Sequence, residues 1–398
     1  VIALAIATMI GDGCCAFVSI RLGAKKDAEA KRGVGTSILW ILCTSIILTA
    51  IYLLFSEPIL TAFGARVNDE TFTLSKEYFF WITLGVPFYM FGQGLNPVIR
   101  SDGSPRYAMV SLLAGALTNC VLDPIFIYPL HMGMKGAAIA TVIGQIVSTA
   151  FALCYLFRMK TIRLDRSAFT FLGGGIAQIL SLGMTSFLSQ VSIVLSMAAV
   201  LNMCQKYGAR DPIFGQAEYA QIPTAVVGIV MKFFQIVMSI AIGLSAGCIS
   251  VVGYNIGAGR RDRASRLMVE LLATEFVIGL CAMILFEGFP NTCISIFGAK
   301  NESVYYTEFA IRCIRLFLST TALACVNKGM FIYLQSLGKA WTSAGLSLLR
   351  EVGFSVGLVL LLPLWFGLDS VLWFMAAADI LTFLVCIPVI LPVRRELR

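Results

Sequence analysis

The most regular feature of the chain is its succession of long apolar runs. Residues 167–205 carry no charged side chain, and residues 33–56 and 136–157 carry none either. Because about 20 predominantly apolar residues cross a bilayer as an α-helix, runs of this length predict membrane-spanning helices. The pattern gives eleven spans, at residues 1–22, 33–55, 73–100, 105–130, 134–158, 171–206, 217–257, 264–289, 304–337, 339–365 and 368–393. We therefore predict an all-α polytopic membrane protein.

The composition agrees with membrane insertion. Only 13% of the residues are charged, 58% are hydrophobic, and the mean hydropathy is +0.86. Charged residues make up about a quarter of an ordinary soluble domain, so a soluble protein of this size could not cover its surface with so few. The sequence also lacks the segments of about ten residues with alternating apolar and polar side chains that are typical of a membrane β-barrel. These observations leave a helical membrane protein as the prediction.

Cysteine and histidine usage argues against a metal centre. Most of the twelve cysteines lie inside apolar runs, where they act as small hydrophobes. No CxxC pair suggests a zinc site, and His131 is the single histidine. We predict no cofactor and no metal beyond a transported Na⁺, and we disfavour histidine-based catalysis.

Alternate loops between the spans differ sharply in basic residues. One set, which includes the C-terminus, holds nineteen of the 30 Lys and Arg residues, and the other set holds six. The positive-inside rule places the richer set in the cytoplasm. The net charge of +8 is therefore a topology signal and does not indicate a nucleic-acid partner.

The chain also repeats itself at an offset of 234 residues. The stretch GCCAFVSIRLGAKKDAEAKR (13–32) aligns with GCISVVGYNIGAGRRDRASR (247–266). The same offset carries FGAR (63–66) onto FGAK (297–300) and PLHMG (129–133) onto PLWFG (363–367). Units of about six helices return the chain to the same side of the membrane, which predicts two parallel repeats. We assign 1–164 to an N-terminal lobe and 165–398 to a C-terminal lobe.

The repeat leaves part of the second lobe without a counterpart in the first. Val1 aligns with Gln235, so the span 171–206 and half of the next one have no mate. By this offset we expect roughly 70 residues to precede Val1. The whole protein would then have twelve helices, of which about eleven are present here.

The stretch GDGCCA (11–16) matches the G-x-G-x-x-A spacing of dinucleotide-binding turns. Such a turn must follow a β-strand, but apolar helical sequence flanks this one on both sides. Its repeat mate, SAGCIS, keeps only the counterparts of Gly13 and Cys14. We interpret the small residues as a point where two helices approach closely. Asp12 stays unexplained, since its mate is Ala246.

Four stretches together resemble the multidrug and toxic compound extrusion (MATE) family, and in particular its bacterial multidrug exporters. They are GDGCCAFVSIRLGAK, NCVLDPIFIYPLHMGMKGAAIATVIGQ, GYNIGAGRRD and LQSLGK. The resemblance implies two six-helix lobes around a central cavity that opens alternately to each side. It also implies a monomer in the bacterial plasma membrane that exports small organic, often cationic, compounds in exchange for Na⁺ or H⁺, and not an enzyme.

The resemblance also implies a cation site in the N-terminal lobe. The family places an Asn and an Asp four residues apart on the fifth helix, a Thr on the sixth and an Asp on the first. Asn119, Asp123 and Thr141 match the first three positions, and the fourth falls before Val1. Some members use acids on the seventh and tenth helices instead, an arrangement that the absence of acids in 171–206 disfavours.

The residues themselves support this site. Asp123 is the single charge in 107–130, and a carboxylate at bilayer depth should face a cavity or a partner. Asn119 lies on the same helical face, and Pro124 frees the carbonyl of Cys120. These oxygens could hold Na⁺, and the carboxylate could instead carry a proton. The alternative is a carboxylate that satisfies a helix kink or lies near the outer interface.

Other polar residues inside the spans are open to two interpretations. Gln145, four residues after Thr141, either completes the site or makes ordinary interhelical hydrogen bonds. Asp379, the repeat mate of Gln145, either forms a second protonation site or pairs with Lys328 or Lys232. Glu275 is a further possible partner for these lysines. One face of 171–206 offers a substrate-cavity wall, or plain helix packing, with Met184, Phe187, Gln190 and Met197.

Three rival functions are weaker on the same residues. A lipid-linked oligosaccharide flippase of a related fold would line its cavity with several arginines, whereas the arginines of this chain lie mainly in the basic loops. An integral membrane enzyme would need clustered acids such as DDxxD or histidine-rich motifs, which the sequence lacks. The six-plus-six repeat with an Asp-Pro pair inside a helix disfavours a channel.

Overall fold

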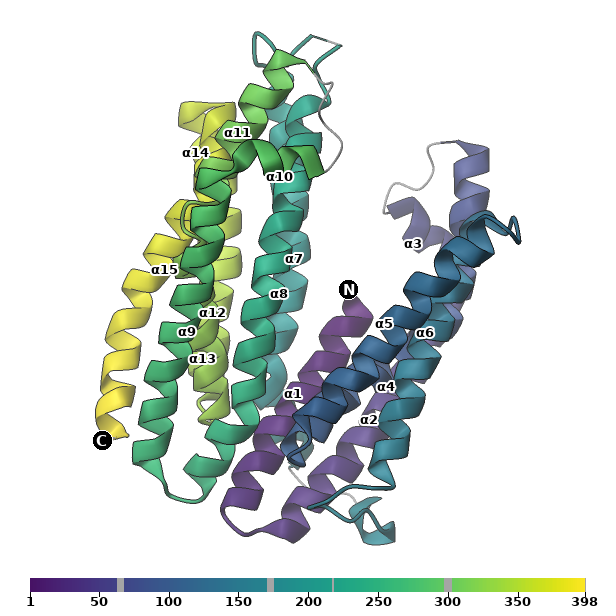
Figure 1. Cartoon of the computed structure of the whole chain (residues 1–398), viewed down its shortest axis with the longest axis vertical. Helices are drawn as coiled ribbons and strands as arrows, with labels where there is room; N and C mark the ends of the chain where they lie inside the picture. Colours follow the sequence, from purple (N-terminus) through teal and green to yellow (C-terminus); the bar gives the residue numbers. More distant parts are fainter. Residues whose placement is uncertain (63–67, 170–174, 217, 297–302, 398) are drawn as a thin grey trace. The chain divides into compact units, whose positions relative to one another are not determined.

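The computed structural model describes residues 1–62, 68–169, 175–216, 218–296 and 303–397, and in these residues every regular element is helical. Figure 1 shows the helices in chain order. Their bounds are α1 (Ile2–Gly23), α2 (Asp27–Leu54), α3 (Ser56–Ala62), α4 (Asp69–Ser101), α5 (Pro105–Ile127), α6 (Gly133–Leu156), α7 (Gly175–Gly208), α8 (Ile222–Gly257), α9 (Arg261–Gly288), α10 (Pro290–Ile296), α11 (Val304–Leu318), α12 (Thr321–Ser336), α13 (Ala340–Leu348), α14 (Gly357–Phe366) and α15 (Leu368–Glu396). A 3₁₀ turn covers Arg166–Phe169, and a π-helical segment covers Leu349–Val356, between α13 and α14.

Each of the eleven predicted spans coincides with helix. Ten helical segments in the described part of the chain are long and apolar enough to cross a membrane. The eleventh predicted span is α4, whose first turns carry acidic residues. The span 304–337 is divided into α11 and α12 at Ser319–Thr320, a break that its apolar pattern did not predict.

The repeat is visible in the helix bounds. Adding 234 to the bounds of α2 and α3 gives 261–288 and 290–296, which are the bounds of α9 and α10. The same addition carries the end of α1 onto the end of α8. Helix α4 corresponds to α11 with α12, α5 to α13 with α14, and α6 to α15. The helices from α1 to α6 therefore correspond element by element to those from the second part of α8 to α15.

Backbone conformation repeats with the helices. Lys25, in the turn between α1 and α2, has φ +58°, and its mate Gly259 has φ +71°. Gly133, at the start of α6, has φ +52°, and its mate Gly367 has φ +69°. Positive φ is readily available to glycine and uncommon for other residues. At these two turns, both copies therefore have a residue with positive φ at the same repeat position.

The chain forms two compact units. The first unit comprises Val1–Phe187 with Gly257–Gly259, and the second comprises Leu188–Ile256 with Arg260–Arg398. Along the sequence, the first boundary between the two units therefore lies within α7. The lobe boundary predicted after residue 164 stays a prediction. The repeat match of FGAR with FGAK lies outside the described residues.

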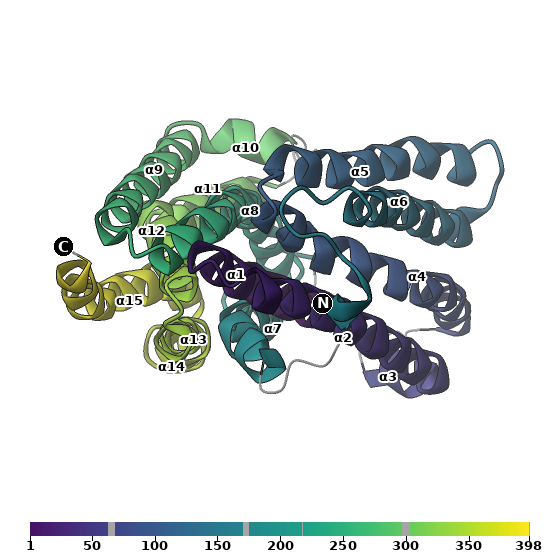
Figure 2. The ribbon, with the colours of Figure 1, turned by 90° about the horizontal axis from the view of Figure 1, so that it is seen from below.

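In the first unit, α4 packs along both α1 and α6, and α5 packs along α6 (Figure 2). Two glycines bring α1 against the first half of α7. A Cβ atom added to Gly13 would lie 2.1 Å from the carbonyl oxygen of Ile179, and one added to Gly183 would lie 1.8 Å from that of Met9. GDGCCA thus lies within a helix at a close helix–helix approach, as its small residues predicted.

A buried carboxylate fixes the loop that follows α6. Asp102, at the end of α4, accepts hydrogen bonds from the Tyr155 hydroxyl at 2.7 Å and from the backbone N–H groups of residues 160–162 at 2.7–3.1 Å. Further along this loop, a hydrogen bond from the Lys31 ammonium lowers the pKa of the Asp165 carboxyl to about 2. These contacts fasten the loop to the ends of α2, α4 and α6.

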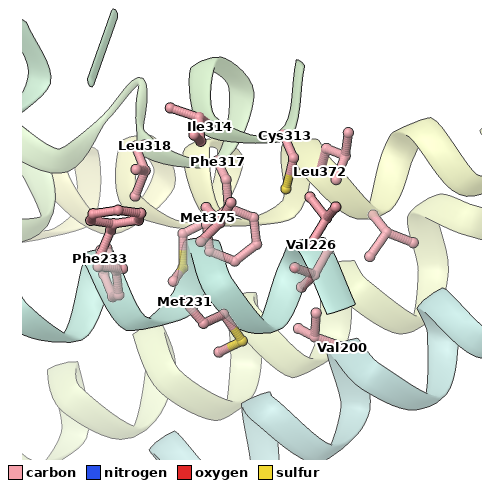
Figure 3. Packing of buried hydrophobic residues seen from close by; sticks show 14 of the residues in the cluster. Val200, Val226, Met231, Phe233, Cys313, Ile314, Phe317, Leu318, Leu372 and Met375 are labelled. Carbon is pink, nitrogen blue, oxygen red and sulfur yellow. The ribbon is translucent and has the colours of Figure 1, made fainter. Parts of the chain in front are cut away.

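The second unit has an apolar core to which most of its helices contribute. Val200 of α7, Phe233 of α8, Phe317 of α11 and Met375 of α15 belong to one cluster of buried side chains (Figure 3). The rings of Phe317 and Phe374 pack edge to face, with centroids 5.4 Å apart. This core holds α11 against α15, and α15 also carries part of a buried polar cluster.

Candidate functional site

Helices α4, α5 and α6 of the first unit enclose a cavity of about 380 Å³. Each helix contributes four lining residues, and several of them are small: Phe88, Tyr89, Gly92, Gln93, Leu112, Gly115, Ala116, Asn119, Thr141, Gly144, Gln145 and Ser148. The side-chain oxygens of Gln145 and Ser148 have no hydrogen-bond partner among the described residues. Both oxygens are buried in the cavity wall, so the polar groups of this wall are only partly satisfied by the protein.

Two glycines set the spacing of α5 and α6 at this cavity. A Cβ atom added to Gly115 would lie 2.6 Å from the carbonyl oxygen of Gly144, and one added to Gly144 would lie 2.7 Å from that of Gly115. Contact this close requires the absence of a side chain on both helices. It places Asn119 of α5 directly against α6.

The structure brings together Asn119, Asp123 and Thr141. The Asn119 amide Nδ2 donates to Asp123 Oδ1 at 3.2 Å and to Thr141 Oγ1 at 3.3 Å. The Thr141 hydroxyl donates to the carbonyl of Ala137 at 2.9 Å. Gln145 lies one turn further along α6, in the wall of the same cavity. Rotation of the Asn119 amide would turn its oxygen toward the other two, giving three oxygen ligands of the kind that Na⁺ binds.

We expect Gly144→Ala to destabilise the protein by about 1–3 kcal/mol, because the added methyl group must push α5 away from α6. The same substitution at Gly243 of α8 is the matched control, since its Cβ would meet no atom within 4 Å. Thermal unfolding in detergent measures both variants. Equal shifts in melting temperature would contradict the close packing described for α5 and α6.

A second polar cluster lies buried in the second unit. Lys328 of α12, Arg350 and Glu351 of the π-helical segment and Asp379 of α15 are each at most 5% exposed. Arg350 donates to Asp379 Oδ1 through Nε at 2.9 Å and Nη2 at 2.8 Å, and to Glu351 Oε1 through Nη1 at 2.7 Å. Lys328 Nζ lies 3.5 Å from Glu351 Oε1. The two positive and two negative side chains of the cluster therefore give it a net charge of zero.

Neutral groups complete this cluster. The Lys328 ammonium donates to the hydroxyl of Ser189 at 2.9 Å, and this hydroxyl lies 3.1 Å from that of Ser347. Asn327 Nδ2 donates to the carbonyl of Asp379 at 2.9 Å, and the Thr320 hydroxyl donates to Asp379 Oδ2 at 3.4 Å. Thr320 lies at the break between α11 and α12, so the break carries one of the cluster's donors.

Sequence reasoning missed Arg350 and Glu351. They are adjacent charges inside the otherwise uncharged stretch 340–365, a signal that marks an intramembrane pair. Asp379 pairs with Arg350, and neither of the lysines proposed for it lies within ion-pair distance in the described structure. Lys328 pairs with Glu351 instead.

The remaining predicted residues lie elsewhere. Glu275 of α9 is fully buried and accepts a hydrogen bond from Ser245 at 2.6 Å, and its Oε2 has no partner among the described residues. Lys232 is exposed and lines a groove of about 600 Å³ between α7 and α8, together with Met197. The other predicted wall residues of α7 are partly exposed, with Met184 and Phe187 in the first unit and Gln190 in the second.

Asp12, which the sequence left unexplained, has two partners in the first unit. Its Oδ1 lies 3.5 Å from Arg100 Nη2, and its Oδ2 accepts a hydrogen bond from the Ser186 hydroxyl at 2.8 Å. The carboxylate thus joins α1 to α4 and α7. This contact is absent from the repeat because Ala246 replaces the acid.

Comparison with known proteins identifies the family. A family model described as MatE matches residues 1–125 and 215–361, more than half of the chain. The chain belongs to the MatE family. The resemblance found in the sequence is confirmed, and with it the prediction of a transporter rather than an enzyme.

Named relatives and solved structures of MatE-type proteins extend over nearly the whole chain. The multidrug export protein MepA of Staphylococcus aureus (strain MSSA476) is 23% identical over 402 residues, covering 100% of this chain and 84% of the relative. A crystal structure of a MATE protein in complex with MaL6 superposes with a TM-score of 0.91 at 22% identity, covering 100% and 86% of the two chains.

A structure of the MATE multidrug transporter DinF-BH superposes with a TM-score of 0.88 at 29% identity, covering 99% of this chain and 85% of that chain. These likenesses confirm the predicted fold class and a multi-pass membrane protein.

Proposed function

We propose that this protein is a secondary active antiporter that exports small organic, often cationic, compounds in exchange for Na⁺ or H⁺. The observation that carries this proposal is the contact of Asn119, Asp123 and Thr141 beside the cavity of the first unit. An ionisable group inside a membrane helix is a functional-site hypothesis by default. The named relatives, a multidrug export protein and a multidrug transporter, support the substrate class.

The mechanism follows from what the site can bind. Asp123 can take up a proton, or it can hold Na⁺ together with the Thr141 hydroxyl and the Asn119 carbonyl after the amide has rotated. A bound cation shifts a conformational equilibrium only if it binds one state more tightly than the other. In our proposal the cation favours the outward-open state, which releases the exported compound.

Location and assembly are part of the same proposal. The protein lies in the plasma membrane of a bacterium, with its C-terminus and the basic loops in the cytoplasm, because nineteen of its 30 Lys and Arg residues lie on that side. It acts as a monomer, with the lipid bilayer and small organic compounds as its partners.

Dye efflux from proteoliposomes tests the function. The intact protein is reconstituted with a fluorescent cationic dye, and Na⁺ and pH gradients are imposed separately. We expect at least one gradient to drive the dye against its own concentration gradient, and collapse of that gradient by an ionophore to stop it. Dye movement that neither gradient accelerates would overturn the proposal of antiport.

A further inference from the structure

The repeat relates the cavity of the first unit to the buried cluster of the second. Adding 234 to the cavity-lining residues Gln93, Ala116 and Gln145 gives Asn327, Arg350 and Asp379. Two of these mates contact the third, because Arg350 donates a hydrogen bond to the Asp379 carboxylate and Asn327 donates one to the Asp379 backbone carbonyl. Residues that line the cavity in the first copy therefore correspond to members of a buried ion-paired cluster in the second.

The helices that carry these residues also correspond. In the first unit α4, α5 and α6 pack on one another, and in the second unit α12 packs on α13 and α15, while the π-helical segment packs on α15. The mates are far less accessible than the cavity wall. Ala116 is exposed and Gln145 partly exposed, whereas Arg350 and Asp379 are 4% and 1% exposed. The second copy therefore buries the positions that are accessible in the first copy.

Two substitutions create the ion pair, because Asp379 also replaces the neutral Gln145 of the first unit. At the position where the first unit has the single methyl group of Ala116, the second has the side chain of Arg350. Its guanidinium donates three hydrogen bonds to carboxylates, two to Asp379 and one to Glu351, at 2.7–2.9 Å. Nε and Nη2 share the single acceptor Asp379 Oδ1, and Nη1 donates to Glu351 Oε1, so all three guanidinium nitrogens bind carboxylate oxygens.

We propose that the cluster occupies the position in the second copy that corresponds to the cavity of the first, and that Arg350 fills this position with its own guanidinium. The second copy is thus a guanidinium site whose ligand is part of the chain. The proposed coupling site is separate, because Asn119, Asp123 and Thr141 have Gly353, Gly357 and Met375 as mates, and none of these contributes to the cluster. The assignment of Arg350 as a built-in cation does not depend on it.

Chemical rescue tests the assignment directly. Arg350→Ala removes the guanidinium but leaves Asp379, Asn327 and Glu351 around the vacated space. We expect the variant to unfold at a lower temperature, and millimolar guanidinium or methylguanidinium to restore at least half of the lost melting temperature. The same salts should leave wild type unchanged, and Na⁺ or tetramethylammonium should restore nothing. A melting temperature that responds equally to all these cations would overturn the proposal.

Arg312→Ala is the matched control. Arg312 pairs with Asp369 at 3.0 Å, but both side chains are at least half exposed. Removing this guanidinium leaves no enclosed space, so we expect no rescue by guanidinium. Rescue of Arg312→Ala to the same extent would show a non-specific salt effect and would count against the proposal.

A second test, which introduces the Arg–Asp pair into the first unit, keeps the proposal testable if Arg350→Ala does not fold. Ala116→Arg alone places a cation in the cavity without a carboxylate at the mate of Asp379. Adding Gln145→Asp recreates the pair. We expect the double variant to be more thermostable than Ala116→Arg, by at least half of the loss that Ala116→Arg causes. No gain, or a further loss, would show that the two copies are not equivalent. Neither rescue nor transplant measures transport, so both stand apart from the test of antiport.

Discussion

Glu351→Gln is expected to lower the stability of the protein by about 3–5 kcal/mol, the usual cost of removing one partner from a buried ion pair. The substitution leaves Lys328 and Arg350 with Asp379 as the one remaining anion of the cluster. Lys328 and Glu351 are 5% exposed and Arg350 4%, so water cannot replace the lost charge. The variant thus buries a net positive charge.

Restoring charge balance should recover most of this loss. In Lys328→Met with Glu351→Gln one charge of each sign is removed, and the pair of Arg350 with Asp379 remains. Buried pairs replaced by apolar groups of similar volume often cost little. We therefore expect the double variant to be clearly more stable than Glu351→Gln, by a favourable coupling energy of at least about 1 kcal/mol.

Thermal or denaturant unfolding in detergent measures Glu351→Gln, Lys328→Met and the double variant. Glu287→Gln is the control, because Glu287 and Arg315 form an exposed pair with 3.9 Å between their charged atoms. An exposed pair contributes about 0–1 kcal/mol. If Glu351→Gln and Glu287→Gln cost the same, or if the double variant is less stable than both of its parents, the description of a balanced buried cluster is wrong.

The largest functional effect is expected from Asp123→Asn. The substitution keeps the shape of the side chain and removes its charge, so the variant should fold and bind dye but lose cation-driven efflux. Thr141→Ala should weaken efflux less, because it removes one neutral ligand oxygen. Thr118→Ala is the control on α5, since its hydroxyl donates to Ala114 of the same helix and does not line the cavity.

Efflux of a cationic dye and drug resistance of cells carrying each variant measure these effects. Comparable amounts of protein in the membrane must first be shown by blotting. We expect Asp123→Asn to be indistinguishable from cells without the transporter, and Thr118→Ala to match wild type. Undiminished efflux by Asp123→Asn would remove this carboxylate from the coupling site.

The sequence predicted the helices well because every helix that crosses a bilayer needs an apolar run of about 20 residues. It did not predict α3 and α10, whose seven residues each are too few for a hydropathy signal. It also gave no sign of the break before Thr321, where no proline interrupts the helix. The offset of 234 predicted the correspondence of the two halves down to individual helix ends.

The site was predictable where spacing along a helix decides the contact. Asn119 and Asp123 are four residues apart on one helix, so their contact follows from helical geometry. The pairing of Arg350 with Asp379 depends on which faces of α13–α14 and α15 meet, and a single sequence does not determine this. The repeat does offer a signal for this pairing, since Arg350 is the mate of Ala116, which lies one turn before Asn119 on α5.

Ion movement driven by dye tests the central claim most directly. Proteoliposomes with the intact protein receive an inward dye gradient and no ion gradient, while pyranine reports internal pH and ²²Na⁺ reports sodium. The account predicts that wild type moves H⁺ or Na⁺ out of the vesicles as dye enters, and that Asp123→Asn moves neither. Dye-driven ion movement that persists in Asp123→Asn would contradict it.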